Sequence, residues 1–314
     1  MAIPGGSSLR ARSASDWRWQ AISLVTYREY HYRSADGRLD LFARDYPAAN
    51  ANDDLSPLLM MHGLTRNSAD FEPLIEQLGT GRRIIVPDQR GRGLSQNDPD
   101  PSNYRPDRYT DDMWKLLDNL GIDKVVCIGT SMGGLISMLM GAQIPDRIIG
   151  IVLNDVGPEV SQEGLDRIRN YVGGGEPMAN WDEAALRCAS INATALDGFT
   201  EADWMAFAKR TCRELSDRQI EFAYDPAISV SMADEEPATV PPDLWALWEA
   251  LTAIPVLAIR RAKSDILEAA TVAQMHRRHP ENFESLEIDG RGHAPILDEP
   301  VAVESIVSFL ERQP

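Results

Sequence analysis

Short apolar runs recur along the chain, separated by stretches in which apolar and polar residues are mixed. The most apolar runs have the composition of strands buried on both faces of a parallel sheet. Two earlier runs alternate polar and apolar positions on either side of a Ser34-Ala35-Asp36-Gly37 turn signal, which is typical of an antiparallel sheet edge. The pattern predicts strands at residues 23–32, 39–43, 58–61, 83–86, 125–128, 148–153, 255–259 and 283–288.

Helices are predicted between most of these strands. Residues 109–120 place apolar side chains at positions 113, 116, 117 and 120, the spacing of one buried helix face. Strands that alternate with helices indicate βαβ units. The sequence therefore predicts an α/β fold, a mostly parallel eight-stranded sheet with helices on both faces. The other predicted helices lie at 71–78, from 135 onward, and at 244–253, 268–278 and 301–310.

The strand pattern stops between residues 159 and 240, where helix-like pieces at 161–172, 182–190 and 201–215 are rich in aromatic residues and Met. An insertion of this kind between two core strands predicts a helical cap over the strand ends. An ordinary subdomain core is the alternative that explains much of the same aromatic content. The predicted organisation is an N-terminal extension at 1–23, a core formed by 24–158 and 241–314, and a cap at 159–240.

The composition limits which kinds of partner we expect the protein to bind. A formal net charge of -17 over 314 residues argues against binding to nucleic acid or to an anionic membrane surface. The chain has three cysteines, an odd number, and their spacing is not that of metal ligands. We therefore predict reduced thiols in a cytoplasmic protein. We find no apolar segment with the length of a signal peptide or a membrane span. Oligomeric state does not follow from the sequence.

The stretch Gly129-Thr130-Ser131-Met132-Gly133 has the G-x-S-x-G spacing of a nucleophile elbow. It follows an apolar strand and opens a helix, which is the context that the motif requires. In such a turn the central Ser is held in a strained conformation above the sheet edge. Ser131 is therefore the predicted nucleophile, and an ordinary strand-to-helix turn is the alternative.

A serine nucleophile needs a base, and the chain has five histidines. His31 is predicted at the surface, His62 in a loop-shaping position after a strand, and His276 and His279 on a solvated helix face. His293 lies in a Gly-rich turn directly after the last predicted strand, where a side chain can reach over the sheet edge. His293 is the predicted general base.

The third group should be a carboxylate on a loop that follows a core strand between the Ser and the His. Asp265 meets this condition and is the predicted acid, with Asp155 after the preceding strand as its competitor. The oxyanion should be bound by two backbone amides, those of Leu64 after a His-Gly pair and of Met132 after the nucleophile.

Taken together, these motifs resemble the α/β-hydrolase superfamily over residues from about 24 to the end of the chain. The resemblance implies that Ser131, Asp265 and His293 form the triad, that a helical cap lies between the strands near 150 and 255, and that Asp88 and the following loop support the site without reacting. Ala262 departs from the pattern, since many relatives carry Gly before the acid. The matching stretches are 61–65, 88–95, 129–134, 264–265 and 292–293.

Serine at the elbow argues against activities that need a carboxylate nucleophile, such as haloalkane dehalogenation. The predicted function is hydrolysis of a small, largely apolar or aromatic carboxylic ester or lactone through an acyl-enzyme. The alternatives are a carbon–carbon bond hydrolase of ring-cleavage diketones and a non-catalytic ligand-binding receptor on the same fold. We expect a small-molecule substrate and no metal or organic cofactor, and the sequence does not identify the substrate-binding residues.

Overall fold

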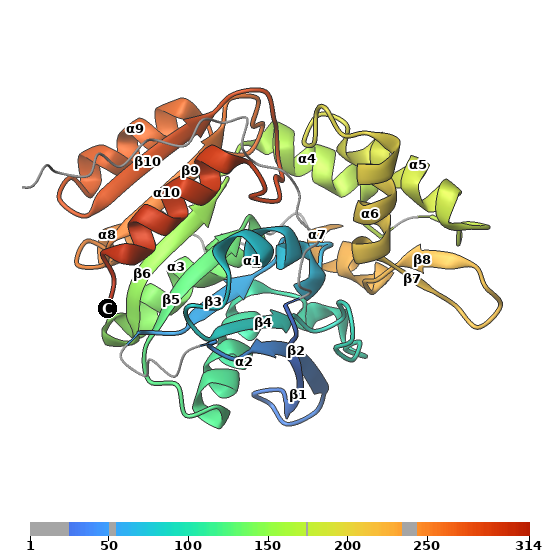
Figure 1. Ribbon diagram of the computed structural model, residues 1–314, viewed down its shortest axis with the longest axis horizontal. Helices are drawn as coiled ribbons and strands as arrows, with labels where there is room; N and C mark the ends of the chain where they lie inside the picture. Colours follow the sequence, from blue (N-terminus) through green and yellow to red (C-terminus); the bar gives the residue numbers. More distant parts are fainter. Residues whose placement is uncertain (1–24, 50–54, 174, 234–243) are drawn as a thin grey trace, which may run out of the picture.

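The computed structural model describes residues 25–49, 55–173, 175–233 and 244–314. The predicted N-terminal extension at 1–23 and the predicted boundary between cap and core near 240 lie outside the described residues. Within the described part, the predicted eight-stranded sheet is confirmed (Figure 1).

The strands follow the order β1-β2-β4-β3-β5-β6-β9-β10 across the sheet. Only β2 runs against its neighbours, pairing antiparallel with β1 and β4, and the remaining pairs are parallel. The carboxyl ends of the central strands therefore meet at one edge, where ligands bind in open α/β sheets. The strands are β1 (Arg28–Arg33), β2 (Asp40–Tyr46), β3 (Leu58–Met61), β4 (Ile84–Asp88), β5 (Val125–Thr130), β6 (Ile148–Asn154), β9 (Val256–Arg261) and β10 (Phe283–Ile288).

Alternate residues of each central strand enter two separate hydrophobic clusters, one on each face of the sheet. Leu59 and Cys127 pack in the cluster with α2 (Pro106–Asn119), α3 (Met132–Gln143), α8 (Leu244–Ala250) and α9 (Ala269–Arg278). Leu58 and Val126 point the other way, toward α1 (Glu72–Leu78) and α10 (Pro300–Glu311). Helices on both faces, as predicted, explain why these strands are apolar throughout. Short 3₁₀ helices cover Ser68–Phe71, Pro101–Asn103, Pro145–Arg147 and Pro226–Ser229.

The described part of the segment between β6 and α8 gathers on one side of the molecule (Figure 1). It contains α4 (Gln162–Tyr171), α5 (Trp181–Asn192), α6 (Glu201–Thr211), α7 (Val230–Ala233) and the antiparallel pair β7 (Cys212–Glu214) and β8 (Ile220–Phe222). Much of it packs in a hydrophobic cluster that includes Met178, Cys188 and Phe207. We call residues 161–233 the cap segment and keep the division into core and cap as a proposal.

The prediction of a helix at 201–215 is wrong at its C-terminal end, because α6 ends at Thr211. Cys212 adopts an extended conformation and pairs with Phe222, while Arg213 forms an ion pair with Glu221 across the two strands. Cross-strand pairing of this kind depends on residues after the turn, which a helix-period pattern does not register.

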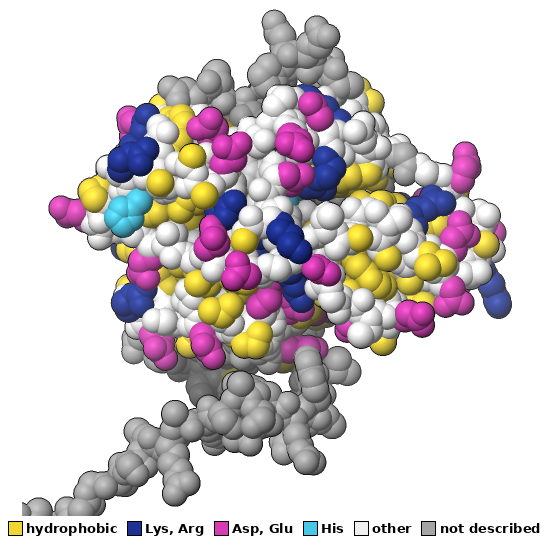
Figure 2. Space-filling view, turned by 90° about the horizontal axis from the view of Figure 1, so that it is seen from above, with side chains coloured by type: hydrophobic (Ala, Val, Ile, Leu, Met, Phe, Trp, Pro, Cys, Tyr) yellow, Lys and Arg dark blue, Asp and Glu magenta, His cyan; other side chains and the backbone are white. Residues whose placement is uncertain are grey.

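The surface carries the net charge without concentrating it on the face shown in Figure 2. Acidic side chains are scattered there, with Lys and Arg among them and hydrophobic side chains between. None of the helices within the described ranges combines the length and apolar character needed to cross a bilayer.

Two glycines allow α3 to begin against the centre of the sheet. A Cβ on Gly133 would lie 1.9 Å from the Met61 carbonyl oxygen of β3, and a Cβ on Gly129 would lie 2.3 Å from the Gly133 carbonyl oxygen. Neither contact is tolerable, because backbone atoms cannot swing aside as a flexible side chain can. The first turn of α3 is thus held against β3 and β5 by the lack of side chains.

We predict that Gly133→Ala lowers the free energy of unfolding by about 1–3 kcal/mol or more, since the methyl group displaces α3 from β3. Urea unfolding followed by circular dichroism measures the change. Gly81→Ala is the matched control, because its Cβ would meet no atom within 4 Å. Equal stability of the two variants would contradict the close approach.

Candidate active site

Ser131 lies between β5 and α3 with φ 52° and ψ -112°, in the left-handed half of backbone space that non-glycine residues rarely occupy. Its amide donates to the Asn154 carbonyl at the end of β6, 3.0 Å away. Gly134 N–H and Leu135 N–H donate to the Ser131 carbonyl. These bonds hold the strained residue in place and direct its hydroxyl away from the sheet.

His293 follows β10 and is 5% exposed. Its Nε2 lies 2.8 Å from the Ser131 hydroxyl oxygen, and its Nδ1 lies 2.9 Å from Asp155 Oδ2. A carboxylate at Nδ1 requires the proton on that nitrogen, which leaves Nε2 free to accept from the serine. The predicted pairing of Ser131 with His293 is therefore present in the structure.

The carboxylate that contacts His293 is Asp155, so the prediction that Asp265 fills this place is wrong in the structure. Asp155 follows β6 with φ 59° and is fully buried. Its carboxylate also accepts from the Arg261 amide at 2.9 Å and from the Ser264 hydroxyl at 2.8 Å. Three donors therefore orient a group whose burial without partners would be costly.

Asp265 instead forms an ion pair with Arg167 of α4. Arg167 Nε donates to Oδ2 and Nη2 donates to Oδ1 at 2.9 Å, and the same Nη2 lies 3.4 Å from the His293 carbonyl oxygen. Burial alone would raise the pKa of Asp265, but the hydrogen bonds and charge of Arg167 hold that pKa below its usual range. The predicted acid thus joins the cap segment to the core beside the histidine.

Leu64 and Met132, whose amides were predicted to bind the oxyanion, line the same cavity as Ser131. Within the described part of the chain, neither amide donates a hydrogen bond to another protein group. Met132 is the first residue of α3, where N–H groups carry the positive end of the helix dipole. Leu64 is held from its other side, since its carbonyl accepts from Arg92 Nε at 2.9 Å. Both amides therefore meet one condition for the predicted role, since no described protein group occupies them.

Asp88 supports the site as the resemblance implied, through hydrogen bonds. Its carboxylate accepts from the Ser68 amide at 2.6 Å and from the Leu94 amide at 2.8 Å, which ties together the loops after β3 and β4. The Gly93 backbone passes so close to Asp88 that a Cβ there would lie 2.1 Å from the carboxylate. Burial raises the pKa of Asp88, and no described contact brings it to Ser131 or His293.

The other histidines take structural positions. His62 donates through Nδ1 to the Gly63 carbonyl and accepts the Gln89 amide at Nε2, and burial lowers its pKa to about 3, so it stays neutral. His31 is exposed, as predicted. His279 is 1% exposed and packs edge-on against Trp248, so the solvated helix face predicted for it is wrong. No group of three or more His, Cys, Asp or Glu within the described ranges is arranged to hold a metal.

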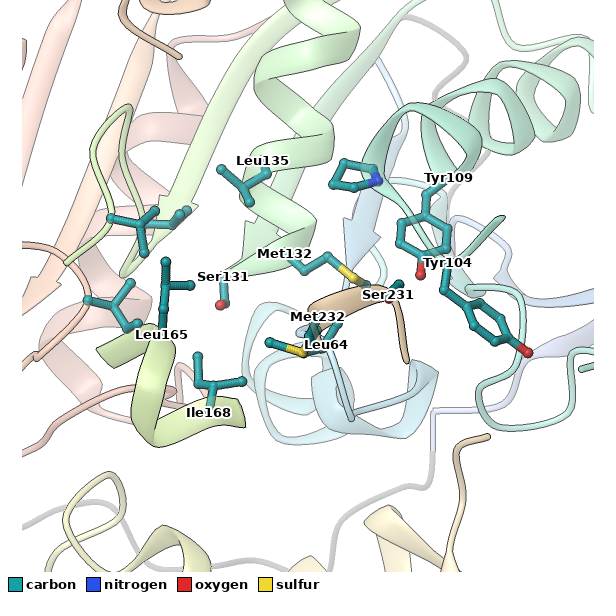
Figure 3. Close-up of a pocket in the computed structure, with 14 residues that line it drawn as sticks. Leu64, Tyr104, Tyr109, Ser131, Met132, Leu135, Leu165, Ile168, Ser231 and Met232 are labelled. Atoms are coloured by element: carbon teal, nitrogen blue, oxygen red, sulfur yellow. The ribbon is translucent and has the colours of Figure 1, made fainter. Parts of the chain in front are cut away.

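A cavity of about 90 Å³ lies over Ser131, between the core and the cap segment (Figure 3). Of its walls, the sequence identified only Leu64 and Met132 in a binding role, through their backbone amides, and none as a side chain that contacts the substrate. The signal that was available is the apolar spacing of Leu165 and Ile168 on α4, which predicts a face but not what that face covers. The walls are mostly apolar and comprise Leu64, Tyr104, Pro106, Tyr109, Met132, Leu135, Val156, Val160, Leu165, Ile168, Ser231, Met232 and Ile266.

Comparison with known proteins agrees with this fold. The family described as the alpha/beta hydrolase fold matches residues 56–300. The 3-hydroxybutyrate-oligomer hydrolase of Cupriavidus necator is 32% identical over 251 residues, 78% of this chain and 85% of that protein. The 2-(acetamidomethylene)succinate hydrolase of Mesorhizobium japonicum is 28% identical over 229 residues, 71% of this chain and 77% of that protein.

Among solved structures, an alpha/beta hydrolase from Novosphingobium aromaticivorans superposes with a TM-score of 0.84 at 40% sequence identity, covering 91% of this chain and 98% of that one. The likeness therefore extends through the cap segment as well as the sheet. The structure of E-2-(acetamidomethylene)succinate hydrolase, with a TM-score of 0.76 at 24% identity, shares the fold.

The ion pair of Asp265 yields a prediction about stability and pH. Because its folded-state pKa is lowered, the pair stabilises the protein above the pKa of the unfolded carboxyl, about 4, and this contribution is lost as pH falls through the folded-state pKa. We expect Asp265→Asn to cost about 1 kcal/mol or less at pH 7, since the pair is partly exposed. The difference from the wild type should shrink below pH 4.

Urea unfolding at a series of pH values measures this difference. Asp289→Asn is the control, an exposed carboxylate that pairs with no cation in the described part of the chain. A cost for Asp265→Asn that stayed constant down to pH 3 would show that the ion pair is not its source.

Proposed function

The chain belongs to the α/β hydrolase fold family and is a hydrolase, and on that premise we propose that it cleaves a small, largely apolar carboxylic ester through an acyl-enzyme on Ser131. One observation carries the proposal. A continuous hydrogen-bonded chain runs from the Ser131 hydroxyl through His293 to the buried Asp155, at the base of a mostly apolar cavity.

In the first half of the proposed reaction, Ser131 Oγ attacks the acyl carbon while His293 Nε2 takes the hydroxyl proton. The negative charge moves to the former carbonyl oxygen, which the amides of Leu64 and Met132 stabilise. His293 then gives its proton to the leaving alcohol as the ester C–O bond breaks. The acyl group remains on Ser131 as an ester.

In the second half, water enters and His293 removes one of its protons as the water oxygen attacks the acyl carbon. The second tetrahedral intermediate collapses, the carboxylic acid leaves, and the proton returns to Ser131. In each half the imidazole carries a positive charge at the transition state. Asp155, fixed by the Arg261 amide and the Ser264 hydroxyl, is placed to stabilise that charge.

The walls of the cavity support a small substrate with an apolar part. Leu135, Val156, Leu165 and Ile168 bring apolar groups from the core and from α4 to the space beside Ser131. The name of the Cupriavidus relative supports the same class, since it describes a hydrolase of oligomers of a small hydroxy acid. We therefore propose short-chain esters, hydroxy-acid esters included, as the substrate class.

Replacing the nucleophile gives the direct test. We predict that Ser131→Ala lowers kcat for p-nitrophenyl acetate and butyrate by at least about 10⁴-fold. A fluorophosphonate probe should add its phosphonyl group to Ser131 of the wild type, as seen by peptide mass spectrometry. Ser137→Ala is the control, a buried serine of the same helix whose hydroxyl bonds the Gly133 carbonyl.

Turnover that survived in Ser131→Ala would rule out the acyl-enzyme. A folded wild type that hydrolysed no ester would favour the alternatives, carbon–carbon bond hydrolysis or ligand binding without turnover. The first of these would show activity on a ring-cleavage diketone, and the second would show binding alone.

A second pair of variants tests the identity of the acid. We predict that Asp155→Asn lowers kcat roughly 10⁴-fold, because an amide no longer holds the proton on His293 Nδ1. Asp265→Asn, which removes the partner of Arg167, should lower kcat by less than about tenfold. Steady-state kinetics on the same esters measures both, and the reverse order of the two effects would restore Asp265 as the acid.

A further inference from the structure

Arg92 is a buried cation without a counter-ion among the residues that the structure describes. It is 1% exposed, and no carboxylate oxygen of the described residues lies within 4.0 Å of its side-chain nitrogens. The neighbouring Arg90 differs, since it forms ion pairs with Asp36, Asp98 and Asp112. An unpaired charge in the interior is unfavourable, so the fold retains Arg92 at a cost in stability.

The guanidinium of Arg92 lies directly behind the wall of the cavity. Its Nε donates to the Leu64 carbonyl at 2.9 Å, its Nη1 donates to the Tyr109 hydroxyl at 2.8 Å, and its Nη2 lies 3.7 Å from Met132 Sδ. It also stacks over the rings of Tyr109 and Tyr104, at 4.9 and 5.4 Å from their centroids. Its contacts are thus mostly with residues that line the cavity, while Arg92 itself does not line it.

The contact with Arg92 determines what the Tyr109 hydroxyl can do. The phenolic oxygen accepts from Nη1, so its own O–H is left to donate elsewhere. Among the described residues that proton has no acceptor, although Tyr109 is 1% exposed. Figure 3 shows the Tyr109 hydroxyl turned toward the Met132 and Ser231 side chains, within the group of residues that line the cavity.

Tyr104, the second tyrosine of this wall, is already satisfied. Its hydroxyl donates to Asp225 at 2.5 Å and accepts the Asp98 amide at 2.8 Å. In Figure 3 it points away from the other lining residues. The cavity therefore presents one free phenolic donor, and that donor is polarised by a cation.

We propose that Tyr109 donates its hydroxyl proton to a carboxylate of the substrate, so that the pocket prefers esters whose acyl or alcohol part ends in a carboxylate. The inference rests on the proposed ester hydrolysis and names its substrate class. The free donor requires an acceptor, and the uncompensated charge of Arg92 favours an anionic acceptor over a neutral carbonyl.

A matched pair of esters tests the preference, namely 3-acetoxybutyrate and the neutral 3-acetoxybutyramide, with hydrolysis followed by titration of the released acid. The wild type should prefer the carboxylate in kcat/KM by about tenfold or more. Tyr109→Phe should remove that preference by lowering kcat/KM for 3-acetoxybutyrate, while the value for the amide changes by less than about threefold.

Tyr32→Phe is the matched control. Tyr32 is also a buried tyrosine whose hydroxyl proton has no acceptor within the described ranges, but it does not line the cavity. The control should keep the wild-type preference. An equal loss of kcat/KM for both esters in Tyr109→Phe would assign Tyr109 a packing role and overturn the proposal. An unchanged preference for the carboxylate in that variant would also overturn it.

A binding measurement separates this inference from the proposed function. Titration calorimetry of 3-acetoxybutyrate into Ser131→Ala protein should give an affinity that falls about tenfold or more when Tyr109→Phe is added. Binding that depends on Tyr109, without hydrolysis by the wild type, would sink the proposed function and keep the carboxylate site. Hydrolysis by the wild type, with binding that does not depend on Tyr109, would keep the proposed function and overturn the carboxylate site.

Discussion

The close approach of α3 to the central strands is the constraint on which the site depends. Gly133 allows the first turn of the helix to lie against the Met61 carbonyl, and Gly129 allows the chain to turn sharply enough to reach it. The same contact brings the end of β3 beside the start of α3, and hence Leu64 beside Met132. If side chains separated these elements, the hydroxyl and the two amides proposed to bind the oxyanion could not face the same carbonyl group of a substrate.

The two aspartates considered for the triad follow adjacent parallel strands. β6 and β9 pair along their length up to Asn154 and Ile259, so Asp155 and Asp265 both emerge near His293. Strand order and spacing therefore could not separate them. The choice depends on contacts from elsewhere, because Ser264 and the Arg261 amide bond Asp155, whereas Arg167 of the cap segment binds Asp265.

The features that could be predicted from the sequence are those that depend on neighbouring residues in the chain. The nucleophile turn around Ser131 and the strands on either side follow from residue size and apolar runs, and the structure contains them. The β7–β8 pair and the burial of His279 depend on partners that are remote in sequence or come after a turn. The spacing of apolar residues does not identify such partners. These features and most of the cavity walls therefore could not be predicted from the sequence.

The net charge of the molecule and the charge of Arg92 behind the cavity wall act on a ligand in different ways. A net charge of -17 would repel an anionic ligand, but salt screens surface charges beyond about 8 Å at physiological ionic strength. The guanidinium of Arg92 acts at contact range through the Tyr109 hydroxyl, in surroundings where water is excluded and charges interact more strongly. An acidic overall composition thus argues against polyanionic partners, while in the proposed site one buried cation favours a small anion, because the two effects operate at different distances.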